Sequence, residues 1–76
     1  MPLVDPEDEP YVEAAAAEFL SICEKKEFTT NTILQTMIAV SGATILEATK
    51  GDKDYEKDLV ERYIQSLKRV LKANPE

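Results

Sequence analysis

The chain has 76 residues, of which 32% are charged, and its net charge at neutral pH is −6. This length accommodates one small domain, whose core is marginal without additional support. The single cysteine, Cys23, excludes an internal disulfide, and the absence of histidine excludes imidazole catalysis and the usual structural zinc sites. Close helix packing and association with a second subunit are the means of stabilisation that remain.

The acidic residues gather at the start of the chain. Residues 1–24 contain seven acids and no base, whereas the rest of the chain is close to neutral. An acidic segment of this kind disfavours nucleic-acid phosphates and anionic membrane surfaces, so we expect no nucleic-acid partner and no membrane partner. The opening residues lack the basic and apolar regions of a secretory signal, which together with the free thiol predicts a cytoplasmic protein.

Residues 1–9 are predicted to form an extended acidic arm. Residues 1–10 include three prolines and four acids, and proline both fixes φ and lacks an amide donor. Leu3 and Val4 are the side chains of this arm that we consider for docking on a partner.

The first helix is predicted over residues 10–26. Asp8 is expected as its N-cap, with Pro10 in the first turn, where a missing N–H is tolerated. Steps of 100° per residue place Cys23 at the middle of a broad apolar face, so we expect a buried, unreactive thiol. The same face carries Tyr11, Val12, Ala15, Ala16, Phe19, Leu20 and Ile22.

The second helix is predicted over residues 31–50, with a threonine cap before it and Gly51 after it. It includes most of a run of nineteen residues, 28–46, without a charged side chain. Its apolar residues surround the helix axis, which is typical of a helix buried on most sides. The run is long enough to span a bilayer, but Asn31, Gln35 and several threonines interrupt it, and a buried core helix is the better interpretation.

The third helix is predicted over residues 53–73, capped by Asp52 or Asp54, with one clean apolar face. Its acids come early and its bases late, which suits the helix dipole. The acids of residues 52–58 resemble a calcium loop only in outline, because its required Gly and Glu positions are occupied by Lys57 and Tyr63. The basic cluster of Lys68, Arg69 and Lys72 is explained by the dipole, or alternatively docks an acidic partner such as the arm of another copy.

These elements predict an all-α, three-helix bundle-like domain over residues 10–76. Its central helix is expected to be largely buried, with about two thirds of its surface covered by the two amphipathic neighbours and the rest by oligomerisation. Gly42 lies in mid-helix, where glycine costs about 1 kcal/mol relative to alanine, so a close helix crossing is expected there, either within the chain or between two copies. The candidate interface residues are Ile38, Ala39, Gly42, Ala43 and Leu46.

The sequence predicts no catalytic residue, cofactor or metal site. We therefore expect a non-enzymatic helical module for protein–protein interaction or regulation that acts as a homo-oligomer, with a dimer as the first choice. One alternative is an acidic decoy that occupies a basic, nucleic-acid-binding type of site on another protein. The other is a carrier of a small apolar ligand.

Overall fold

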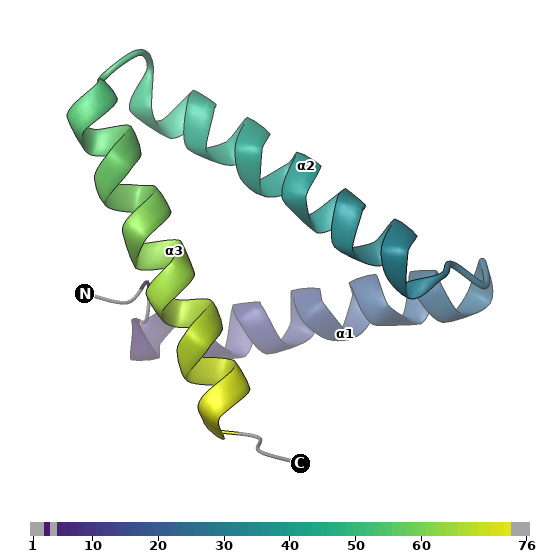
Figure 1. The fold of residues 1–76 in the computed structure, drawn as a ribbon. Coiled ribbons are helices and arrows are strands. Elements are labelled where there is room, and N and C mark those ends of the chain that lie inside the picture. The colour runs from purple at the N-terminus through teal and green to yellow at the C-terminus, as the bar shows by residue number, and fades with distance from the viewer. Residues whose placement is uncertain (1–2, 4, 74–76) are drawn as a thin grey trace. The chain divides into compact units, whose positions relative to one another are not determined.

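The computed structural model describes Leu3 and residues 5–73, and these residues form helices and turns with no strand among them. A 3-10 turn, η1 (Pro6–Asp8), precedes three α-helices, α1 (Glu9–Lys25), α2 (Thr30–Thr49) and α3 (Lys53–Ala73) (Figure 1). The all-α prediction is confirmed, and the predicted helix ends lie within one residue of the observed ones. The expectations for Val4 and for the residues beyond Ala73 fall outside the described residues.

The sequence predicts an extended arm over residues 1–9, but Pro6–Asp8 within this segment form a 3-10 turn. The Asp5 side chain accepts a hydrogen bond from the Glu7 N–H at 3.0 Å, and the Asp8 N–H donates to the Asp5 carbonyl at 2.9 Å. This turn already gives Asp8 a helical backbone, with φ −86° and ψ −13°. Asp8 occupies the N-cap position of α1, but its side chain makes no capping hydrogen bond there. The predicted capping role of Asp8 is therefore wrong, because capping occurs one turn earlier, at Asp5.

Residues 5–41 form one compact unit, made of α1, the turn after it and the first part of α2. The turn is a Schellman motif, in which the Phe28 N–H donates to the Cys23 carbonyl at 3.0 Å and the Glu27 N–H donates to the Glu24 carbonyl at 3.1 Å. Glu27 takes the left-handed conformation, with φ +54°. Thr29 then caps α2 by accepting a hydrogen bond from the Thr32 N–H at 3.2 Å, which confirms the predicted threonine cap.

Of the described residues, Leu3 and residues 42–73 form the second compact unit, which contains the last part of α2 and α3. α2 ends through two residues of positive φ, Lys50 at +45° and Gly51 at +90°. Asp52 caps α3, because its carboxylate accepts a hydrogen bond from the Tyr55 N–H at 3.1 Å. In the same unit the Leu3 N–H donates to the Ser66 hydroxyl oxygen at 2.7 Å, which attaches the start of the chain to α3.

Burial within the chain is confined to one residue near each interhelical turn. Among the described residues, only Cys23, near the end of α1, and Thr49, at the end of α2, are buried. The buried position of Cys23 confirms the sequence prediction. Phe19 and Ile33 in one unit, and Leu59 and Tyr63 in the other, are half-buried. Each unit is therefore a pair of helical segments with a small apolar cluster, and most apolar side chains stay accessible.

Candidate interaction surface

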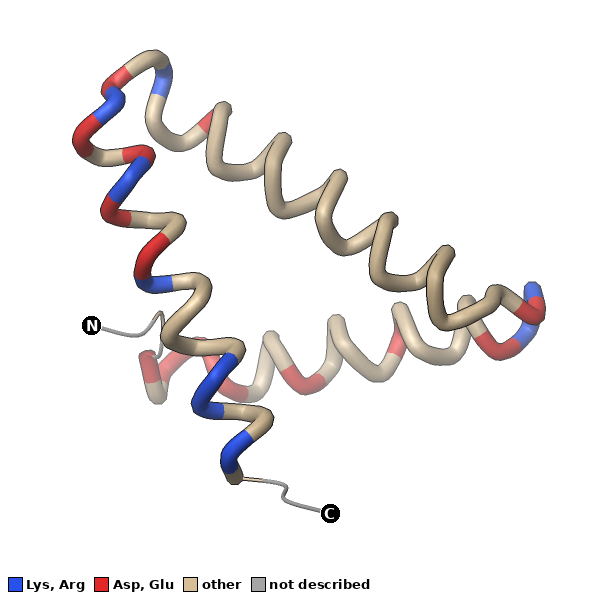
Figure 2. Tube along the Cα trace, in the orientation of Figure 1, with Lys and Arg blue, Asp and Glu red and all other residues tan. Residues whose placement is uncertain are grey.

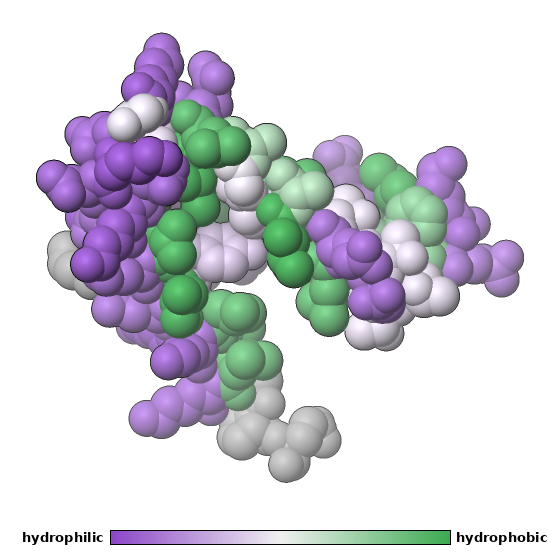
Figure 3. Space-filling view, turned by 45° about the horizontal axis from the view of Figure 1, so that its top comes forward, coloured by the Kyte–Doolittle hydropathy of each residue, from purple (hydrophilic) through white to green (hydrophobic). Residues whose placement is uncertain are grey.

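The most apolar helix of the protein is also one of its most exposed elements. Along α2, Ile38 is 70% exposed and Leu46 is 62% exposed, and Thr49 is the one buried residue of the helix. Figure 2 shows the length of α2 that carries neither Lys, Arg, Asp nor Glu, and Figure 3 shows apolar side chains at the accessible surface. The expectation that neighbouring helices cover about two thirds of α2 stays a prediction, and so does the completion of its burial by oligomerisation.

The five predicted interface residues occupy the exposed surface of α2. Ile38, Ala39, Gly42, Ala43 and Leu46 are all accessible to solvent. A Cβ atom added at Gly42 would have no atom within 4 Å, apart from the neighbouring backbone of its own helix. The close helix crossing expected at Gly42, either within the chain or between two copies, stays a prediction.

The apolar faces of α1 and α3 are also incompletely covered. Tyr11 and Val12 of α1 are strongly exposed, and so are Val70 and Leu71 of α3. Each helix carries one such face at helical spacing, so each can pack against a further helix along its length. The apolar surface that the chain leaves open thus extends over all three helices.

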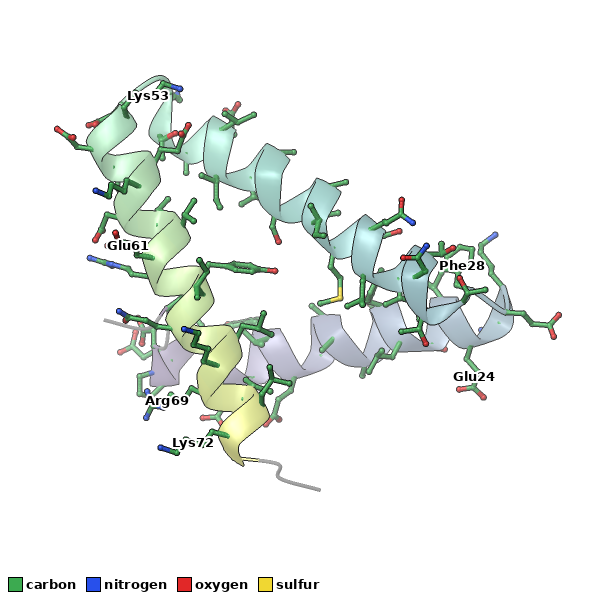
Figure 4. The ribbon with its side chains drawn as sticks, viewed as in Figure 1. Glu24, Phe28, Lys53, Glu61, Arg69 and Lys72 are labelled. Carbon is green, nitrogen blue, oxygen red and sulfur yellow. The ribbon has the colours of Figure 1, made fainter. Side chains whose placement is uncertain are left out.

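Two ion pairs join charged residues within α3. Arg62 Nε lies 3.0 Å from an Asp58 carboxylate oxygen, four residues earlier, and Lys53 Nζ lies 3.6 Å from a Glu56 carboxylate oxygen. Both pairs are exposed, so each contributes little to stability. In the described part of the chain, no ion pair involves the basic cluster near the end of α3. Figure 4 shows Arg69 and Lys72 on the last turns of that helix.

Within Leu3 and residues 5–73, no group of three or more His, Cys, Asp or Glu side chains is placed to hold a metal ion. The acids after Gly51 serve α3 locally, since Asp52 caps it and Asp58 pairs with Arg62. The Thr49 hydroxyl is buried and has no hydrogen-bond partner among the described residues. No sequence signal singled out Thr49, because its burial depends on how α3 follows the turn.

α2 passes the length and composition test for a membrane-spanning helix. It is the one described helix long and apolar enough to cross a bilayer. Core helices of soluble proteins also pass this test when their own chain buries them, and the chain buries little of α2. A single such helix is weak evidence for a membrane span, because the core helix of a soluble protein and a signal sequence near the N-terminus pass the same test.

Comparisons with protein families, with curated proteins and with solved structures give no match for this chain.

Proposed function

We propose that the protein is a non-enzymatic helical interaction module that acts as a homo-oligomer, with the dimer as its basic form. The observation that supports this proposal is the exposed apolar surface of α2, which includes Ile38 and Leu46. Apolar surface of this extent is unfavourable in water, and soluble proteins that carry it generally bury it against a partner. A second copy is the simplest partner, because the same patch then covers itself.

Sedimentation of the purified protein at micromolar concentration tests the proposal. We expect a dimer or a larger defined oligomer, with helical content that falls when dilution separates the subunits. A helical monomer at micromolar concentration contradicts the proposal. Partition of that monomer into neutral phosphatidylcholine vesicles would then assign α2 to a lipid phase, because neutral lipids remove any contribution from charge.

The acidic decoy is a second candidate, and the charge of α1 is the observation that favours it. In the described residues no ion pair involves an acid of residues 5–24, so these carboxylates are available to a basic partner. Binding of such a partner would weaken steeply as salt is raised, whereas association through α2 would not. Titration with a polycation such as polylysine at two salt concentrations distinguishes the two candidates.

A further inference from the structure

We draw no further inference here: the strongest candidate, the apolar face of α2 that includes Ile38 and Leu46, carries no proposal beyond the homo-oligomer, because nothing in the structure shows what covers it.

Discussion

Among the described residues, Cys23 is the one buried apolar side chain, at 3% exposed. Its position follows from the apolar face of α1 and from the Schellman turn, in which its carbonyl accepts a hydrogen bond from Phe28. A thiol reagent reaches such a side chain only when the surrounding structure opens. Reactivity of Cys23 therefore measures the stability of the unit that contains α1.

We expect Cys23 to react slowly with a thiol reagent in the native protein and rapidly in denaturant. The physical reason is its burial, since opening of the unit must precede attack. Absorbance of the released chromophore measures both rates. In a Cys23→Ala background, Ser21→Cys provides an exposed thiol on the same helix and should react rapidly without denaturant. Fast native labelling of Cys23 itself would show that the thiol is accessible and would contradict its burial.

Thr49 is buried in a less favourable way. Its hydroxyl is inaccessible and has no partner in the described chain, and an unsatisfied buried polar group costs about 1–3 kcal/mol. We expect Thr49→Val to raise the free energy of unfolding by about 1 kcal/mol, because valine has a similar shape and no hydroxyl. Chemical denaturation followed by circular dichroism measures the change.

Thr36→Val is the matched control for this substitution. The Thr36 hydroxyl donates to the Thr32 carbonyl at 2.8 Å, so its removal takes away a hydrogen bond and should give no gain in stability. A stabilisation of equal size at both positions would show that helix propensity, and not the buried hydroxyl of Thr49, is responsible.

At the scale of elements, the sequence predicts the first residue of a helix well where a side chain forms the cap. Thr29 and Asp52 cap α2 and α3 as expected, because their hydroxyl and carboxylate groups suit those positions. The side-chain cap was predicted at Asp8, but Asp5, three residues earlier, is an equally good cap and starts a 3-10 turn. No glycine marks the end of α1 in the sequence, because Glu27 occupies the left-handed position that glycine normally takes.

We expect Glu27→Gly to stabilise the turn between α1 and α2 by about 0.5–1 kcal/mol. A side chain in the left-handed region costs about 1–2 kcal/mol, and the greater freedom of glycine in the unfolded chain offsets part of the gain. Thermal unfolding monitored by circular dichroism measures the effect. The same exchange at Glu18, inside α1, should instead destabilise by about 1 kcal/mol. A loss of stability at Glu27 would contradict the role assigned to its positive φ.

At the scale of the whole molecule, the sequence predicts which surface needs a partner but not which surface covers it. The charge-free run and the mid-helix Gly42 both indicate a packed central helix; the structure confirms the helix, α2 (Thr30–Thr49), and its packing stays a prediction. Periodicity assigns residues to faces of a helix, but the burial of a face depends on neighbours that local sequence does not specify.

Gly42→Leu tests whether the middle of α2 is where two copies meet. In the isolated chain the new side chain enters open space, so we expect the helix to gain up to about 1 kcal/mol from propensity alone. At a close crossing of two α2 helices the same side chain forces the backbones apart, and overpacking of this kind costs about 1–3 kcal/mol. We therefore expect a folded chain with weakened association, while Gly42→Ala weakens it less. Circular dichroism reports folding, and sedimentation reports association. A Leu variant that is more stable and still associates like the wild type would place Gly42 away from any interface.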